Sequence, residues 1–348
     1  MIVYSASDAI SPAINRTKSY LFHRFRFWTY IKLCLVAVLT DGASSFTGNS
    51  SGTNHNSTHS FLALPGSATD FGVLVILPAV LLALALMLWI WYLLVRLRFA
   101  YFHCLVYQTK EIGPGWRLYA QPAMRMFQFQ LVVVLIFLAA VALIVGPFFF
   151  FFRGALAGGA QPGIGTTLSV IAVLTPFVFA LIFVSIALEI ITHDFMLPQM
   201  ALEGMTIGEA WHAARLHYLA EKGSFWFYGF LRIVLAIVGG IVAVVILIIP
   251  IVFAGLLFFA FYYALHSMLA DATGFALFVR ESVLILIGTI GAALAILLCI
   301  SIGGPIATWK RYYALLFYGG RFPQLGDLLS PPPPPPPFES LPGPSVAV

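Results

Sequence analysis

Charged residues are scarce in this chain of 348 residues. Asp, Glu, Lys and Arg make up 9% of it, against about 25% in an average soluble domain. Hydrophobic residues make up 61%, and the mean hydropathy is +0.98. A soluble fold would have too little polar surface to cover so large an apolar core, which excludes that class. The composition indicates a multi-pass integral membrane protein, with the lipid bilayer as its first partner.

Cysteine is also rare, and Cys34, Cys104 and Cys299 are far apart with no Cys-x-x-Cys pair. We expect buried free thiols rather than a disulfide or a metal site.

The net charge of +5 is not gathered into a soluble basic segment with interleaved aromatics, so no nucleic-acid partner is expected. No catalytic residue set, cofactor motif or metal motif is recognisable. No apolar run has an ionisable residue near its centre, where ion-coupled transporters usually have one.

Five apolar runs are long enough to cross a hydrocarbon core of about 30 Å as helices. They are Phe71–Val95, Phe127–Phe151, Thr167–Ile191, Leu231–Leu269 and Ser282–Ile302. A sixth run, Trp28–Thr40, is shorter and reaches spanning length if its helix continues through residues 41–46 or the bilayer thins locally. We expect this run to be retained as a span, although a cleaved signal peptide would look partly similar.

The run Leu231–Leu269 is too long for one straight crossing and contains Pro250, so it forms either one span with an extension or two spans. Basic residues favour the first alternative, because 16 of the 18 lie in four segments, 16–32, 96–125, 215–232 and 310–321. A single crossing places all four segments on one side, which the positive-inside rule makes cytoplasmic. We therefore predict one all-α domain, residues 1–329: a polytopic bundle of six transmembrane helices with both termini cytoplasmic.

Two segments are expected to lie outside the packed domain. Residues 44–68 are rich in Ser, Thr, Asn and Gly and predict a flexible extracytoplasmic loop. Residues 330–348 form a proline-rich, disordered cytoplasmic tail, in which Pro331–Pro337 must adopt an extended polyproline II conformation. That rod either binds an aromatic-lined groove on a protein partner or is a stiff tail without one.

A five-residue motif occurs twice, as IGPGW at 112–116 and as IGEAW at 207–211. After each isoleucine, apolar or small residues recur at offsets 3, 4, 7 and 11, which is one face of an α-helix, and Ile10 begins a third copy. A start signal supports the helix that begins at Ile207, because Thr206 and Glu209 have the spacing of a capping box. In the middle copy, Pro122 is expected to end the helix early.

The three copies predict three amphipathic helices in the cytoplasmic interface, each ahead of a pair of spans. Ile14, Trp116 and Trp211 are expected to anchor them in the membrane. A threefold internal repeat would have units near 10–96, 112–191 and 207–303, with coincidence among ordinary interfacial helices as the alternative.

In the last span, Gly288 with Ala292 and Gly291 with Ala295 have the spacing of a close helix contact, within the monomer rather than in a dimer. The oligomeric state is not predicted.

Glu189, His193 and Asp194 form the densest polar cluster beside a span. Glu189 and His193 are four residues apart and share a face of a continuous helix, as a metal or proton-handling site would need. The alternative is an ordinary boundary cluster that ends the fourth span, since two such residues do not complete a ligand set. Convergence with other cytoplasmic-side histidines, His103, His212 and His217, would be required for a metal site.

Several stretches carry a resemblance to a known family, namely RLRFAYFHCLVYQTKEIGPGW, HDFMLPQMALEGMTIGEAW and RYYALLFYGGRFPQLGDLL. With the N-terminal segment, they resemble an uncharacterised family of bacterial multi-pass membrane proteins with a domain of unknown function. The second stretch is weakly similar to the membrane domain of some glycerophosphodiester phosphodiesterases, whose soluble catalytic domain has no counterpart here. The resemblance implies a bacterial inner membrane and assigns no residue a role.

The leading functional prediction is a non-enzymatic envelope protein that organises or recruits partners. The alternative is a small-solute or lipid transporter, which a polar cavity at bilayer depth would favour. An inner-face membrane enzyme that uses Glu189 and His193 is the third.

Overall fold

The computed structural model describes residues 4–23, 25–45, 69–157, 164–268 and 274–329. Pro331–Pro337 and all but the first two residues of the predicted loop 44–68 lie outside these ranges.

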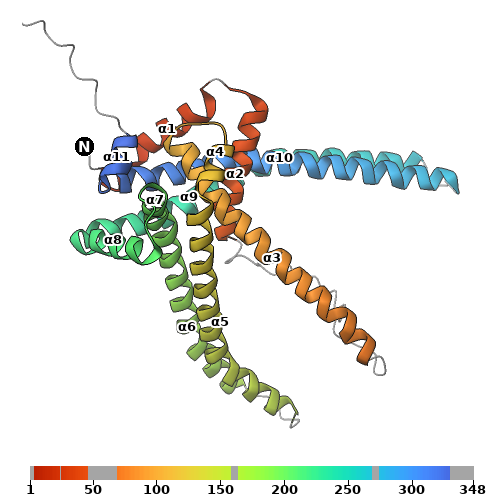
Figure 1. Cartoon of the computed structure of the whole chain (residues 1–348). Coiled ribbons are helices and arrows are strands. Elements are labelled where there is room, and N and C mark those ends of the chain that lie inside the picture. The colour runs from red at the N-terminus through yellow and green to blue at the C-terminus, as the bar shows by residue number, and fades with distance from the viewer. Residues whose placement is uncertain (1–3, 24, 46–68, 158–163, 269–273, 330–348) are drawn as a thin grey trace, which may run out of the picture.

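The described chain is all-α, as predicted, and Figure 1 shows its arrangement. Its elements are α1 (Ile10–Phe22), α2 (Phe27–Ser45), α3 (Thr69–Val106), α4 (Gly113–Leu118), α5 (Ala120–Ala157), α6 (Ile164–Ile190), the π-helix η1 (Ile191–Met196), α7 (Leu197–Leu202), α8 (Ile207–Ala220), α9 (Lys222–Met268), α10 (Phe275–Gly319) and α11 (Pro323–Leu329).

Five of the described helices are long and apolar enough to cross a membrane. The candidate spans are Leu77–Val106, Ala120–Phe148, Ala172–Leu202, Lys222–Ser267 and Phe278–Gly319. The sixth predicted span corresponds to α2, which does not belong to this group. Lys32 and Asp41 limit its apolar run, and Leu33, Cys34 and Ala37 are buried inside the protein rather than exposed along a lipid-facing surface.

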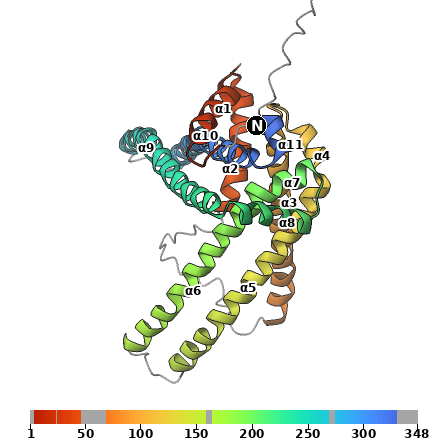
Figure 2. The ribbon, with the colours of Figure 1, turned by 90° about the vertical axis from the view of Figure 1, so that its left-hand side faces the viewer.

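The core lies at one end of the molecule. Nearly all buried side chains come from residues 4–41, 95–126, 190–232 and 307–329, which together we call the hub. Aromatic rings fill much of it; for example, Tyr228 stacks on Phe317 with ring centroids 4.3 Å apart. Three arms leave the hub in different directions: α3, the pair α5 and α6, and the pair α9 and α10 (Figures 1 and 2).

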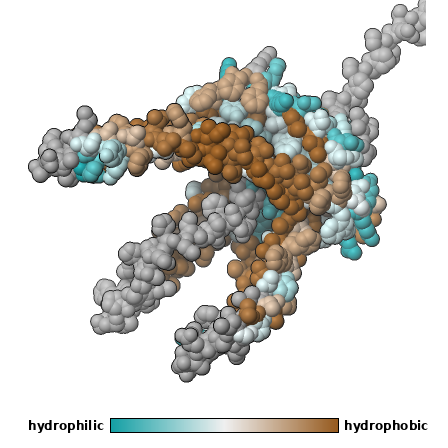
Figure 3. Space-filling view, turned by 180° about the vertical axis from the view of Figure 1, so that it is seen from behind, coloured by the Kyte–Doolittle hydropathy of each residue, from teal (hydrophilic) through white to brown (hydrophobic). Residues whose placement is uncertain are grey.

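The arms leave their apolar surface uncovered. No more than 6% of the most apolar window of any candidate span is buried inside the protein, and Figure 3 shows hydrophobic surface along the upper arm. The structure therefore departs from the predicted bundle, because the described spans do not share a core. Apolar side chains in a membrane gain little from packing on each other instead of on lipid, so the spans do not need to form a common core.

The ambiguous run Leu231–Leu269 belongs to one helix. The α9 helix continues without a break through Pro250, and α10 returns beside it. This continuity agrees with one span plus an extension. The basic segments accordingly lie in the hub, whereas Arg153 and Arg280 lie near the far ends of α5 and α10.

The close helix contact of α10 is not where the spacing of small residues placed it. A Cβ atom added at Gly291 would meet nothing within 4 Å, and one at Gly288 would reach only the Phe258 ring at 3.9 Å. The close contact instead joins α10 to α2, where a Cβ atom at Gly304 would lie 2.6 Å from the Cα atom of Cys34. Small residues permit the two backbones to approach at this point because α2 packs inside the hub.

The three short helices begin at the motif isoleucines. Ile10 and Ile207 are the first residues of α1 and α8, and Ile112 is the N-cap of α4. Residues at offset 3 are buried in every copy, namely Ala13, Gly115 and Ala210, and so are those at offset 7, namely Thr17, Tyr119 and Ala214. The middle helix ends at Leu118, four residues before Pro122, and the Thr206–Glu209 capping box is formed.

Each short helix packs against the hub end of a long helix. The α4 helix contacts α3, α8 contacts η1, which continues α6, and α1 contacts α10. The contact of α1 with α10 joins the first motif copy to the last long helix of the chain. The three contacts are equivalent in cyclic order, with α10 taken as the long helix that precedes α1.

Candidate functional site

The predicted cluster lies where α6 changes its helical register. Glu189 is at the end of α6, and His193 and Asp194 belong to η1. Pro198 has no N–H group to donate to the carbonyl of Asp194, so the ordinary helical bond is lost there. A π-helical turn of this kind is rare and often marks a functional position. His193 and Asp194 are buried and Glu189 is half-buried.

Asp194 is the centre of an ionic network inside the hub. Its Oδ2 atom lies 3.0 Å from Arg232 Nε and accepts a hydrogen bond of 2.8 Å from the Tyr228 hydroxyl. Its Oδ1 atom lies 3.8 Å from Arg311 Nη1. These partners come from α9 and α10, so one carboxylate of η1 joins three parts of the chain. Burial without such partners would be costly for any charged group.

A second ion pair lies nearby, between Lys310 of α10 and Asp41 of α2. It connects the short N-terminal apolar helix to the long C-terminal one. Asp41 therefore extends the ionic network to α2.

Arg98 has a different environment. Its Nε atom donates to the carbonyl of Thr40 at 3.0 Å, and its Nη1 atom donates to His193 Nε2. Gln130 Nε2 also donates to His193 Nε2, at 3.1 Å. These donors assign Nε2 as the acceptor and leave the ring hydrogen on Nδ1. Within the described ranges, no carboxylate oxygen lies within 4.0 Å of the Arg98 side-chain nitrogens.

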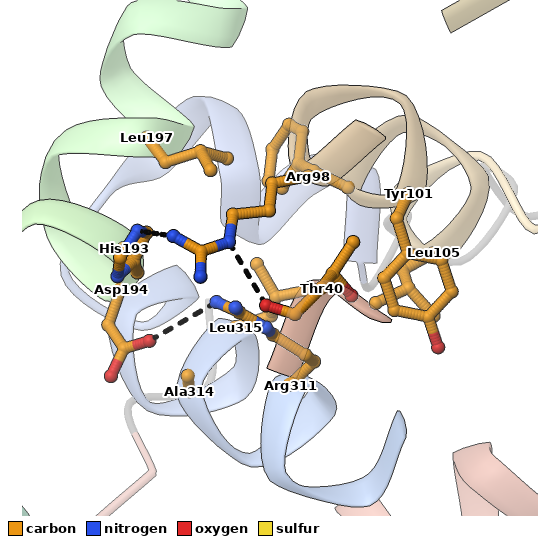
Figure 4. A pocket seen from close by; sticks show the side chains of 11 residues that line it. Thr40, Arg98, Tyr101, Leu105, His193, Asp194, Leu197, Arg311, Ala314 and Leu315 are labelled. Carbon is orange, nitrogen blue, oxygen red and sulfur yellow. Dashed lines mark hydrogen bonds and ion pairs between the residues drawn. The ribbon is translucent and has the colours of Figure 1, made fainter. Parts of the chain in front are cut away.

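Two cavities adjoin this network, and a third lies beside the larger of them. The smallest, about 20 Å³, is lined by Arg98, His193, Asp194 and Arg311 among others, and Figure 4 shows these side chains directed toward one another. It has room for about one water molecule. A larger cavity of about 390 Å³ lies between α3, α5 and α6, and we call it the cleft. A third, of about 460 Å³, lies between α5 and α6 and shares Phe137, Val141, Ser185 and Glu189 with the cleft.

The cleft has a polar end and apolar walls. Arg98, Gln130, Glu189 and His193 lie on its polar side. Its walls include Trp91, Phe129, Val133, Val134, Phe137, Leu138 and Val141, and the adjoining cavity adds Leu174, Phe177, Val178, Leu181 and Ile182. This combination suits an amphiphilic molecule better than a fully hydrated solute.

The other predicted histidines do not join His193. His103 packs on the rings of Tyr107 and Tyr119, His217 meets the Tyr318 ring edge-on, and His212 is exposed. Across the described ranges, no three His, Cys, Asp or Glu side chains are close enough together to hold a metal ion.

The predicted anchor residues differ in exposure. Ile14 and Trp211 are exposed on the hub surface. Trp116 is half-buried, and the Arg96 guanidinium lies 4.6 Å from its ring centroid. Their insertion into a membrane stays a prediction.

The sequence contained a signal for Arg98 that the motif analysis did not use. Arg98 precedes Ile112 by fourteen residues, and His193 precedes Ile207 by the same number. Corresponding positions of two motif copies thus supply the two side chains that bind each other in the hub. Gln130 and Arg232 had no comparable signal, because a polar residue near a span end is also expected at an ordinary membrane boundary.

A family model matches residues 4–328, nearly all of the described chain. The chain belongs to the family of unknown function DUF7544. No curated protein and no solved structure matches this DUF7544 chain. The match ends within α11, so the ionic network, the cleft and all five candidate spans fall inside the family region.

Proposed function

We propose that this membrane protein binds an amphiphilic molecule, such as a lipid, from the bilayer through the cleft between α3, α5 and α6. The observation that supports the proposal is the 390 Å³ cavity, with a polar end at Arg98 and Gln130 and apolar walls continuing into a second cavity. Ligand pockets are typically about 300–1,000 Å³ in volume. An apolar ligand tail would face the α5–α6 walls, and a polar head would reach the hub.

The proposed orientation places the hub on the cytoplasmic side of a bacterial inner membrane. Four basic segments lie in the hub, and positively charged residues near spans favour the cytoplasm. The bacterial assignment rests on the family resemblance. The α1 and α11 helices both belong to the hub, and α3 runs from the far end of its arm into the hub (Figure 1). We therefore propose six crossings, namely the five candidate spans and one more ahead of α3.

The same proposal treats the chain as three related units, 10–96, 112–191 and 207–303. Two features favour this repeat: equivalent burial at offsets 3 and 7, and the cyclic order of contacts between short helices and long helices. The cleft then lies between the last long helix of the first unit and the two long helices of the second.

The lipid-binding role is favoured because the cleft combines a polar end with apolar walls. The recruitment hypothesis concerns Pro331–Pro337, which lie outside the described residues. Pull-down from native membranes with and without residues 331–348 tests that alternative separately. The proposed role assigns binding rather than catalysis to Glu189 and His193, so a non-enzymatic protein remains the proposal.

The test uses a substitution that fills the cleft without altering the hub. Ser185 lines both larger cavities, and its neighbour Val184 is exposed and lines neither. Ser185→Phe should remove lipid that the full-length protein retains during mild detergent purification, measured by native mass spectrometry. Val184→Phe is the matched control and should retain it. Equal lipid retention in both variants would overturn the proposal.

A further inference from the structure

Arg98 is the unusual cation of the buried network. Four cationic side chains belong to the network: Arg98, Arg232, Lys310 and Arg311. Arg232 and Arg311 lie within 4.0 Å of Asp194, and Lys310 pairs with Asp41. Arg98 is 7% exposed and binds a neutral ring nitrogen and a backbone carbonyl instead. A buried guanidinium without a carboxylate provides a favourable position for an anionic group from a ligand.

The position faces the cleft, where another polar group has bonding capacity left. Gln130 lines the cleft beside His193, and its Oε1 atom has no hydrogen-bond partner in the described part of the chain. Buried polar atoms are normally hydrogen-bonded, so this oxygen indicates room for a polar ligand beside Arg98.

Glu189 adds the opposite charge at a different place. It lines the cleft and the adjoining cavity, is half-buried, and has no cation within 4.0 Å in the part of the chain that the structure describes. A second negative charge on the ligand would be repelled there, whereas an ammonium group would be attracted. The cleft therefore presents one cation deep in the hub and one anion nearer its apolar walls.

We propose that the cleft selects a zwitterionic phospholipid whose phosphate diester binds Arg98 and whose primary ammonium group binds Glu189. A guanidinium forms strong charge-assisted hydrogen bonds to phosphate, and Nη2 of Arg98 remains to donate to a ligand oxygen after the bonds to Thr40 and His193. The acyl chains lie along the apolar walls of α5 and α6. This inference rests on the proposed lipid-binding function and adds the chemistry of the headgroup.

The test measures headgroup preference in the full-length, delipidated protein. Short-chain phosphatidylethanolamine and phosphatidylglycerol compete at equal concentration, and native mass spectrometry gives the ratio of bound lipids. Diacylglycerol of the same chain length tests the need for phosphate, and inorganic phosphate tests whether the free ion suffices. We expect phosphatidylethanolamine to exceed phosphatidylglycerol about tenfold, equivalent to one ammonium–carboxylate contact of about 1.4 kcal/mol.

Glu189→Gln is the decisive variant because Glu189 is half-buried and has no cation within 4.0 Å to lose among the described residues. The variant should bring the ratio close to one, an outcome that misfolding does not produce. Glu281→Gln, an exposed glutamate at the far end of α10, is the control and should keep the wild-type ratio. Arg98→Gln should lower phospholipid binding to the level of diacylglycerol.

The results separate this inference from the proposal on which it rests. An unchanged ratio in Glu189→Gln, together with lipid loss in Ser185→Phe, would overturn the headgroup assignment alone. The headgroup assignment would also be overturned if diacylglycerol bound as tightly as phosphatidylethanolamine. Displacement of bound lipid by inorganic phosphate would overturn it too. Equal lipid retention in Ser185→Phe and Val184→Phe would overturn both.

Discussion

Replacing Gly304 by alanine tests the contact that joins α2 to α10. The added Cβ atom would lie 2.5 Å from Cys34 Sγ and 2.6 Å from Cys34 Cα, and therefore meets backbone as well as side chain. A flexible side-chain end could move aside, but a helix backbone cannot do so locally. Either α2 shifts away from α10 or the two helices store the strain, and both outcomes destabilise the hub.

The magnitude follows from two opposing effects. Overpacking a tight site typically costs about 1–3 kcal/mol of folding free energy. Replacing glycine by alanine inside a helix itself stabilises by about 1 kcal/mol. Gly291→Ala, in the same helix, gains the second effect without the first, because nothing lies within 4 Å of its added Cβ atom. The difference between the two variants should therefore equal the overpacking cost, about 1–3 kcal/mol.

The assay is the apparent Tm of each full-length variant in detergent, followed by size-exclusion chromatography of the remaining soluble protein. A change of 1 kcal/mol corresponds to roughly 2–4 °C in a soluble protein of 150–250 residues. The Tm of Gly304→Ala should be lower than the Tm of Gly291→Ala by at least roughly 2–4 °C. Identical melting of the two variants would refute the close approach of α2 to α10.

Three further predictions concern other parts of the hub. Gly115→Ala should lower the Tm relative to Gly113→Ala, because its Cβ atom would lie 3.1 Å from the α3 backbone whereas the Gly113 position is open; equal values would argue against the packing of α4 on α3. Asp194→Asn should destabilise by about 3–5 kcal/mol because it leaves buried guanidinium groups without their carboxylate, and a wild-type Tm would contradict the network. Trp211→Glu should weaken membrane association of an α8 peptide, measured by vesicle flotation, whereas His212→Glu should have a smaller effect; similar losses would contradict the anchor assignment.

Local features of the chain were predictable because they depend on neighbours in sequence. The apolar runs gave the five candidate spans, although their helices extend beyond the runs into the hub. The motif isoleucines predicted the starts of α1, α4 and α8, and Thr206 with Glu209 predicted a formed capping box. Such features follow from helical periodicity and from the unsatisfied N–H groups of a helix start.

The candidate site was predictable only in part. Glu189, His193 and Asp194 were selected because three polar residues end an apolar run. Their burial was not predictable, since the same residues at an ordinary membrane boundary would remain hydrated. Arg311 was visible only as a member of a basic segment, and the one further signal for Arg98 was its spacing from Ile112. The meeting of both arginines with η1 depends on contacts between residues far apart in the chain.

By itself the sequence determined an all-helical membrane protein, its long apolar segments and the beginnings of its short helices. Composition and periodicity are sufficient for these, because water, lipid and the helical repeat act on each segment separately. Only the tertiary structure decided that the spans diverge, that α2 packs into the hub at Gly304, and that Arg98 and Glu189 face one cleft. Those features depend on which helix faces meet, and many pairings of apolar faces are nearly equal in energy until side-chain shape and buried charge distinguish them.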